Sequence, residues 1–434
     1  SAKAKTKTLR GWGVAKLLIL IGALAFFIFG MKLMSEGLQQ AAGSRLRSML
    51  GSITSNRVKG VFTGFGITSI VQSSSVTTVM TVSFVNAGLM TLRQSAGVMM
   101  GANIGTTITA WIIVLLGFKL SISSYAFMIL ALAAPLLFIS KGKARAWVTA
   151  IFGFCILFMG LDELKHAVPS LDADSAIVQF FIDFKNAWYG PVMFVLLGAL
   201  VTVVIQSSSA AMALTLAMVA AGTIPFEVAC AMVLGENIGT TITAELASLI
   251  ANVHAKRSAR IHSMFNIVGV TWMVLLISFT PVLDLVSYFA IEVMGVADPK
   301  TAEGAPMGLA IFHSGFNIIN VAIMIGFVPF LVKLAIKSVK SKGGADEEYH
   351  LEYISTGILA TPEMSVLEAQ KEIARFGEIT SRMNGFVKSL LNDISTNLLG
   401  RFVDVKEKKG SVLEETPHLV TETADEEESR HREI

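Results

Sequence analysis

Long apolar stretches separated by short polar segments run through the first 340 residues of the chain. Crossing the hydrocarbon core of a bilayer takes about 20 consecutive apolar residues in a helix. Five stretches reach or approach this length, at about 13–34, 122–140, 146–164, 262–280 and 306–333. The pattern predicts an all-α polytopic membrane protein.

Two further regions, 60–117 and 190–250, are also apolar, but Gly, Ser, Thr, Asn and Gln recur throughout them. In lipid, every polar group has to find a partner within the protein. One uninterrupted helix therefore describes neither region, and we expect a broken helix in each.

Composition excludes several other classes of protein. Of 434 residues, 53% are hydrophobic and 15% are charged, whereas roughly 25% are charged in soluble domains. These values exclude a disordered chain, a disulfide scaffold and a nucleic-acid-binding protein, and they argue against a soluble enzyme. The two cysteines, Cys155 and Cys230, lie in apolar runs, so we interpret them as small hydrophobic fillers.

Charge divides the chain near residue 341. Residues 1–340 carry a net charge of +11 and residues 341–434 a net charge of −8. We therefore expect four parts: a basic N-terminal segment (1–12), a first transmembrane repeat (13–140), a second repeat with terminal helices (141–340) and an acidic tail (341–434).

Loop charges predict the orientation of the spans, because Lys and Arg are enriched in cytoplasmic loops. Basic clusters occur within 45–59, 141–145, 256–260 and 333–342, and acidic residues within 162–185 and 284–303. Placing the basic clusters inside gives a multi-pass protein of a cell inner membrane with a cytoplasmic C-terminus. Because segment 1–12 then falls outside despite its basic charge, the side of the N-terminus stays open.

An internal repeat links the two polar regions. Residues 64–110 align with 198–244 without gaps, and 19 of the 47 aligned positions are identical. The predicted spans cross in opposite directions before the two copies, so we expect two inverted-topology repeats. In such transporters, broken helices of the two halves meet near the bilayer midplane.

The repeat preserves two polar motifs, Gln-Ser-Ser-Ser and Asn-Ile-Gly-Thr-Thr. Four consecutive polar residues do not fit one helix stripe, so a helix break or hairpin explains them better than a continuous span. Backbone N–H groups at a helix start favour an anion. Free carbonyls, hydroxyls and amide oxygens are neutral hard ligands that suit Na⁺. The motifs contain no Lys or Arg, which favours cation-coupled anion transport.

Three further residues or motifs are candidates near these motifs. Glu236 stands where the first repeat has Ala102, and an intramembrane carboxylate is either a cation ligand, a proton carrier or a helix-end residue that reaches water. The pattern His-x-x-Phe-Asn occurs twice, at His262–Asn266 and His313–Asn317. Because positions four apart share a helix face, each pair can bond internally or to a neighbouring broken helix, and we favour a supporting role.

These paired motifs resemble those of the type II sodium/phosphate cotransporters, in particular the bacterial members, over about residues 13–335. The resemblance implies sodium-driven uptake of inorganic phosphate by alternating access, with elevator-like movement of a domain that carries two re-entrant hairpins. It implies no catalytic residue and no cofactor, with Na⁺ as the coupling ion.

The resemblance also implies where the ligands bind. Phosphate is assigned to the two serine-rich motifs, Gln72, Ser73, Ser74 and Ser75 with Gln206, Ser207, Ser208 and Ser209. Sodium is assigned to Gln72, Ser75, Asn103, Thr106 and Thr107, and to Gln206, Ser209, Glu236, Asn237, Thr240 and Thr241. His262, Asn266, His313 and Asn317 are assigned to support these groups.

The tail is predicted to contain an amphipathic helix at about 362–395, because apolar residues recur there at intervals of three or four. It resembles the start of a PhoU-like domain and is expected either to assemble a homodimer or to bind a regulatory partner. Two other functions stay open: a Na⁺-coupled transporter of another anion, such as sulfate or a dicarboxylate, and a phosphate sensor that signals through the tail. The expected partners are phosphate, sodium and the lipid bilayer.

Overall fold

The computed structural model describes residues 14–51, 56–168, 176–185, 187–341, 370, 372–378, 380–392 and 394. Throughout these residues the chain forms helices joined by short turns, and none of them lies in a β-strand. The chain divides into two units, residues 1–369 and 370–434. The N-terminal segment 1–12 and the acidic end of the tail lie outside the described residues.

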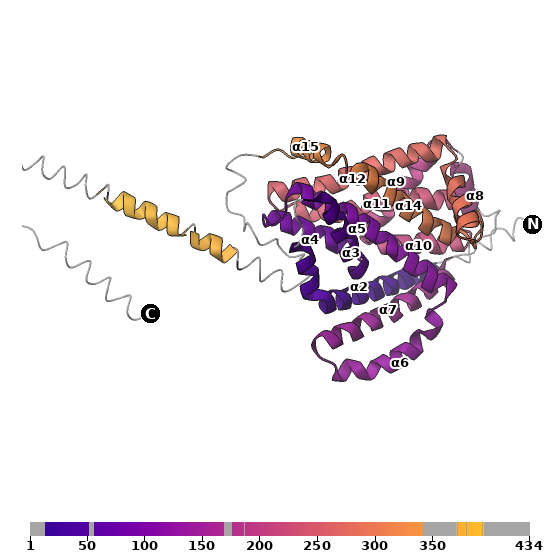
Figure 1. Cartoon of the computed structure of the whole chain (residues 1–434). Helices are drawn as coiled ribbons and strands as arrows, with labels where there is room; N and C mark the ends of the chain where they lie inside the picture. The colour runs from indigo at the N-terminus through magenta and orange to yellow at the C-terminus, as the bar shows by residue number, and fades with distance from the viewer. Residues whose placement is uncertain are drawn as a thin grey trace, which may run out of the picture. The chain divides into compact units, whose positions relative to one another are not determined.

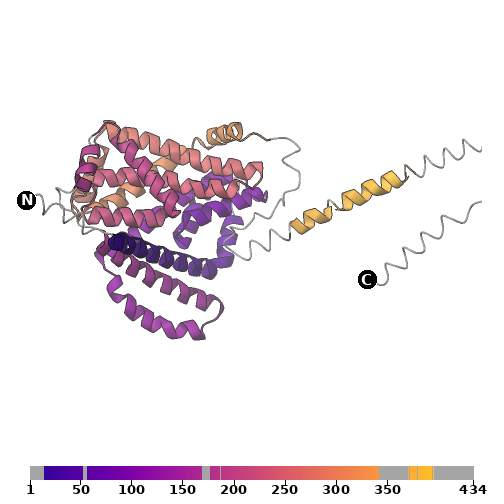
Figure 2. The same cartoon turned by 180° about the vertical axis from the view of Figure 1, so that it is seen from behind.

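A pair of closely packed helices, α2 (Val14–Gly51) and α7 (Gly142–Ala167), forms one side of the first unit (Figures 1 and 2). Their axes come so close that a Cβ on Gly30 would lie 2.3 Å from the Leu157 nitrogen, and one on Gly153 would lie 2.1 Å from the Met34 nitrogen. Small residues allow such contact between membrane helices. Helix α6 (Ser123–Ile139) packs on α7, and its large apolar side chains remain exposed.

The two repeats each form three helices. In the first these are α3 (Arg57–Val71), α4 (Ser74–Asn86) and α5 (Leu92–Ile112), which continues as the π-helix η1 (Ile113–Lys119). In the second they are α9 (Gly190–Ile205), α10 (Ser208–Ala220) and α11 (Phe226–Ser248). In both repeats the first helix packs against the third.

Matched glycines set this packing in both repeats. A Cβ on Gly101 of α5 would lie 1.9 Å from the Val61 oxygen of α3. A Cβ on the aligned Gly235 of α11 would lie 1.9 Å from the Val195 oxygen of α9. No side chain fits at these distances, so both glycines are required for the same close helix contact.

The remaining helices cover the repeats. They are α8 (Ala176–Lys185), α12 (Val253–Phe279), α13 (Val282–Tyr288) with η2 (Phe289–Val293), α14 (Ala305–Met324) and α15 (Val328–Ser338). The main core of buried side chains includes Phe27, Phe158, Phe194, Leu216 and Phe312, so it joins the α2–α7 pair to the second repeat and α14.

Five helices are long and apolar enough to cross a membrane: Val14–Gly43, Leu92–Lys119, Gly142–Ala167, Val253–Phe279 and Ala305–Met324. The chain is therefore a multi-pass membrane protein, as predicted. The predicted stretch 122–140 matches the 17-residue helix α6 to within one residue at each end, and α6 is shorter than these five helices. One predicted span differs from the structure. The stretch 306–333 is two helices, because Pro329 starts the new helix α15.

The described residues of the second unit, between 370 and 394, are helical. Large apolar side chains that include Phe376, Met383 and Leu390 are exposed along this helix. It falls within the predicted amphipathic range of 362–395, of which the first residues lie outside the described part. The likeness of the tail to a PhoU domain stays a prediction.

Candidate functional site

Both serine-rich motifs interrupt a helix in the same way. Gln72 ends α3 in the left-handed conformation (φ 56°, ψ 28°), and Gln206 ends α9 at φ 56° and ψ 24°. The next residues, Ser73 and Ser207, are extended, with φ of −146° and −145°. A left-handed residue other than glycine costs about 1–2 kcal/mol. The predicted broken helices are thus confirmed, and both repeats retain the same strained residue.

Capping bonds stabilise each break. The N–H of Gln72 donates to the Thr68 carbonyl and that of Gln206 to the Thr202 carbonyl, both at 2.7 Å. The Ser73 hydroxyl accepts from the Val76 N–H at 3.3 Å, and α10 has the matching Ser207 cap on Ala210. Each motif therefore contains both the carbonyl end of one helix and the N–H end of the next, where partial charges of opposite sign lie within a few residues.

The two glutamine side chains differ. Gln72 is buried, its amide oxygen accepts from the Thr109 hydroxyl at 3.1 Å, and its amide nitrogen donates to the Ser69 carbonyl at 2.5 Å. Gln206 is exposed. Thr243, which aligns with Thr109, instead donates to the Thr240 carbonyl at 2.9 Å. The glutamine side chain of the first motif is thus buried and bonded within its own repeat, whereas that of the second motif is exposed.

A buried amide cluster joins the first repeat to α12. The Asn103 amide of α5 donates to the Asn266 oxygen at 2.6 Å, and the Asn103 oxygen lies 3.3 Å from Nε2 of His262. The Asn266 amide donates to the His262 carbonyl at 3.0 Å. These bonds pair both polar atoms of the Asn103 side chain and both of the Asn266 side chain, whereas Nδ1 of His262 is buried without a partner. The supporting role of His262 and Asn266 stays a prediction.

The matching cluster joins the second repeat to α14 and lacks one bond. Nε2 of His313 lies 3.4 Å from the Asn237 oxygen, and the Asn317 amide donates to the His313 carbonyl at 2.9 Å. The Asn237 amide nitrogen and the Asn317 oxygen are both buried without a partner. These atoms correspond to the pair that forms the 2.6 Å bond in the first repeat.

A second set of contacts pairs the helices the other way, joining α5 to α14 and α11 to α12. The Trp111 indole of α5 donates to the Ser314 hydroxyl of α14 at 2.8 Å. At the aligned position of α11, Glu245 accepts from the Ser263 hydroxyl of α12 at 2.7 Å and from Arg260 at 3.0 Å. Each third helix of a repeat therefore touches both α12 and α14, so these two helices are equivalent partners of the repeats. In the sequence, the equivalence of α12 and α14 is indicated by Ser263 and Ser314, which hold the same place in the two His-Ser-x-Phe-Asn elements.

Glu236 is the only carboxylate of the predicted site. Its side chain is 2% exposed, its Oε1 accepts from the Thr215 hydroxyl at 2.7 Å, and its Oε2 is buried without a partner. In the first repeat Ala102 occupies the position of Glu236. Thr81, which aligns with Thr215, donates instead to the Thr77 carbonyl at 2.7 Å. A helix-end residue that reaches water is therefore wrong for Glu236. A buried carboxylate oxygen without a partner is expected to have a cation, a proton or a water beside it.

The motif threonines all donate to carbonyls of their own helices: Thr106 to Ala102, Thr107 to Ile104, Thr240 to Glu236 and Thr241 to Ile238, at 2.7–3.0 Å. Their oxygen lone pairs stay available to a cation. Among the described residues, no hydrogen bond joins one serine-rich motif to the other. The sequence reading missed Thr109 and Thr215, although both are identical between the aligned repeats.

Comparison with known proteins decides the family. A family model described as Na⁺/Pi-cotransporter matches residues 26–166 and 183–338. The chain belongs to this family. The predicted resemblance to this family is thereby confirmed, and the family is one of transporters.

Individual relatives of the chain carry different names. A protein of Salmonella typhimurium named as a putative inorganic phosphate export protein is 26% identical over 379 residues, which are 87% of this chain and 65% of that protein. An uncharacterized protein of Bacillus subtilis is 30% identical over 58% of this chain and 81% of its own length. Human sodium-dependent phosphate transport protein 2B is 38% identical over 106 residues, 24% of this chain and 15% of its own. No solved structure matches the chain.

Proposed function

We propose that the chain is a sodium-coupled symporter of inorganic phosphate, which works by alternating access in a bacterial inner membrane. The observation that carries the proposal is the duplicated helix break, with the same left-handed glutamine and the same serine cap in both repeats. The first N–H groups of α4 and α10 suit the oxygens of a phosphate. The carbonyl ends of α3 and α9 and the neutral side-chain oxygens suit sodium.

The phosphate assignment covers Gln72–Ser75 and Gln206–Ser209. With no Lys or Arg in either motif, the anion depends on helix ends, hydroxyls and bound cations. That dependence supplies the coupling in this proposal, because a bound Na⁺ lowers the electrostatic cost of bringing phosphate into the membrane.

The sodium assignment keeps the predicted neutral ligands of both repeats and adds one carboxylate. The proposed ligands are Gln72, Ser75, Asn103, Thr106, Thr107, Gln206, Ser209, Glu236, Asn237, Thr240 and Thr241. The unpartnered Oε2 of Glu236 supports its place among them. Because Ala102 has no such oxygen, the sodium sites of the two repeats are unequal in this proposal.

The two amide clusters give alternating access a concrete form. With the Asn103–Asn266 bond made and its Asn237–Asn317 counterpart unmade, the first repeat is closed and the second open. In this proposal the two repeats are inverted in the membrane, and the opposite state exchanges the bonds while the hairpins move relative to α2 and α7. The buried Gln72 and the exposed Gln206 agree with such an exchange.

Export is a second candidate direction, because the Salmonella relative is named as a putative exporter. The chain covers 65% of that relative, so the relative's function does not transfer directly. A symporter moves phosphate toward the side to which sodium flows, whichever side that is. The tail helix is proposed to assemble the protein or bind a regulatory partner, and it is not part of the transport step.

Uptake of labelled phosphate into proteoliposomes tests the proposal. An inward Na⁺ gradient is expected to accumulate phosphate above its equilibrium level, and replacement of Na⁺ by K⁺ is expected to abolish accumulation. Unlabelled sulfate or a dicarboxylate in excess should leave the uptake unchanged. Uptake that is indifferent to Na⁺ would overturn the symport proposal, and competition by sulfate would reassign the anion.

A further inference from the structure

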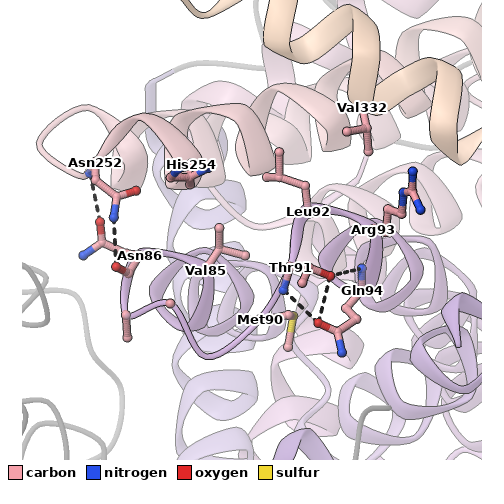
Figure 3. Close-up of a pocket in the computed structure, with 12 residues that line it drawn as sticks. Val85, Asn86, Met90, Thr91, Leu92, Arg93, Gln94, Asn252, His254 and Val332 are labelled. Atoms are coloured by element: carbon pink, nitrogen blue, oxygen red, sulfur yellow. Dashed lines mark hydrogen bonds between the residues drawn. The ribbon is translucent and has the colours of Figure 1, made fainter. Parts of the chain in front are cut away.

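A pocket of about 730 Å³ lies beside the loop that joins α4 to α5, outside the proposed transport site (Figure 3). Much of its wall is apolar and comes from Val85, Met90, Leu92 and Val332. Two side chains that can carry positive charge, Arg93 and His254, also line it. An amphipathic ligand fits such a lining better than a small ion does. Its apolar part would remove the apolar wall from water, which is favourable, whereas a small ion would leave that wall hydrated.

The pocket lies where spanning helices begin. Arg93 is the second residue of α5 and His254 the second residue of α12, and both helices are candidate spans. Val332 comes from α15, which buries Val328, Leu331 and Ala335 against the bundle. The same short helix exposes Phe330 and Leu334 beside Lys333. A short helix with this mixture is typical of the boundary between hydrocarbon and headgroups.

The charge at this end of the bundle is positive. Lys256 and Arg257 follow His254 on the first turns of α12. No ion pair joins Arg93 to an acidic side chain in the described part of the chain. In the second repeat, Glu227 occupies the position of Arg93 and forms an ion pair with Lys185 at 3.2 Å. The basic pocket therefore belongs to the first repeat alone.

We propose that this pocket binds an anionic phospholipid, with the headgroup phosphate at Arg93 and His254 and the upper acyl chain against the apolar wall. Basic pockets at the ends of membrane helices bind anionic headgroups in this manner. Free inorganic phosphate would leave the apolar wall uncovered, so the lipid is the occupant to which the geometry points.

The bound lipid would contact the hairpin of the first repeat. Val85 and Asn86 end α4, the helix that starts at the serine-rich motif. Asn86 is already tied to α12, because its side-chain oxygen accepts from the Asn252 N–H and its carbonyl from the Asn252 amide, both at 2.9 Å (Figure 3). A lipid in the pocket would strengthen this junction and so stabilise the closed state of the first repeat.

Lipid binding to the purified full-length chain tests the proposal without a transport assay. Thermal unfolding is measured in nanodiscs of phosphatidylcholine with increasing phosphatidylglycerol, and separately with inorganic phosphate. Phosphatidylglycerol is expected to raise the unfolding temperature. Arg93→Gln should weaken the apparent affinity for this lipid about fivefold, the effect expected for one basic residue at a membrane surface. Inorganic phosphate should give the same small shift in both proteins.

Arg145→Gln is the matched control, because Arg145 is an exposed basic residue at the predicted cytoplasmic end and lies outside the pocket. This variant should keep the wild-type affinity. Equal loss in Arg93→Gln and Arg145→Gln, or no loss in either, would overturn the site. If Arg93→Gln fails to fold, Val332→Trp fills the pocket instead and should reduce the lipid effect, and an unchanged effect would again overturn the proposal.

Discussion

The two repeats share their backbone and differ in the polar groups within it. Gln72 and Gln206 have the same φ, and their ψ values are 28° and 24°. Yet Gln72 is buried and bonded to Thr109, whereas Gln206 is exposed. The first repeat also makes the buried Asn–Asn bond that the second lacks. Both repeats thus build the helix break in the same way, whereas identical polar residues make different contacts in each.

In both repeats the packing of the first helix against the third depends on glycine contacts. Substitution of these glycines should have the largest effect on the free energy of unfolding. Gly101→Ala and Gly235→Ala each place a Cβ 1.9 Å from a backbone oxygen of the neighbouring helix. Each should lower the free energy of unfolding by about 3 kcal/mol, the upper end for overpacking. Thermal unfolding in detergent measures the loss. Gly22→Ala is the control, since its Cβ would meet nothing within 4 Å; an equal loss there would show that the close contacts are unimportant.

The motif glutamines come next. Gln72→Ala and Gln206→Ala should both abolish Na⁺-dependent phosphate uptake, because each removes the amide of a proposed ligand site. Only Gln72→Ala should also reduce stability, by about 1 kcal/mol for its lost Thr109 bond. Uptake and thermal unfolding are measured on the same preparations. Normal transport in both variants would remove the serine-rich motifs from the site.

Glu236 tests the unequal sodium sites. Glu236→Gln keeps an acceptor for Thr215 but removes the negative charge. We expect the Na⁺ concentration for half-maximal uptake to rise about tenfold, which corresponds to about 1.4 kcal/mol. Glu227→Gln, at the start of α11 and paired with Lys185, should leave the Na⁺ dependence unchanged. Unaltered Na⁺ dependence in Glu236→Gln would show that this carboxylate is not a sodium ligand.

The smallest expected effect is a difference in stability between variants of the two amide clusters. Asn266→Ala loses the bond to Asn103, whereas Asn317→Ala removes an oxygen that is already unpartnered. Without ligands, Asn266→Ala should therefore be less stable than Asn317→Ala by about 1 kcal/mol. Chemical or thermal unfolding without Na⁺ and phosphate measures the difference. Equal losses would mean that the two repeats are closed to the same degree.

The sequence allowed the helix breaks to be predicted because their signal is local. Four adjacent polar residues in an apolar run exclude a continuous span, and duplication made the signal unmistakable. The split of 306–333 was also encoded locally, by Pro329, but the apolar run concealed it. The helix α6 was predicted to within one residue at each end, because polar residues flank its apolar run.

Contacts between distant segments of the chain were harder to predict from the sequence. The His-x-x-Phe-Asn spacing allowed either an internal bond or a bond to a neighbouring helix, and the internal Asn266 and Asn317 bonds to the His262 and His313 carbonyls follow from helix geometry. It did not identify Asn103 and Asn237 as the cross-helix partners, because that depends on how α12 and α14 pack on the repeats. Likewise, nothing local distinguishes the buried Gln72 from the exposed Gln206. Their difference arises from the tertiary arrangement of identical motifs.

The most direct test of the account measures sodium movement driven by phosphate. Proteoliposomes receive equal Na⁺ on both sides, labelled Na⁺ outside and an inward phosphate gradient. The account predicts that labelled Na⁺ accumulates inside together with phosphate, and that Gln206→Ala abolishes both movements. Phosphate entry with no net movement of Na⁺ would contradict sodium coupling.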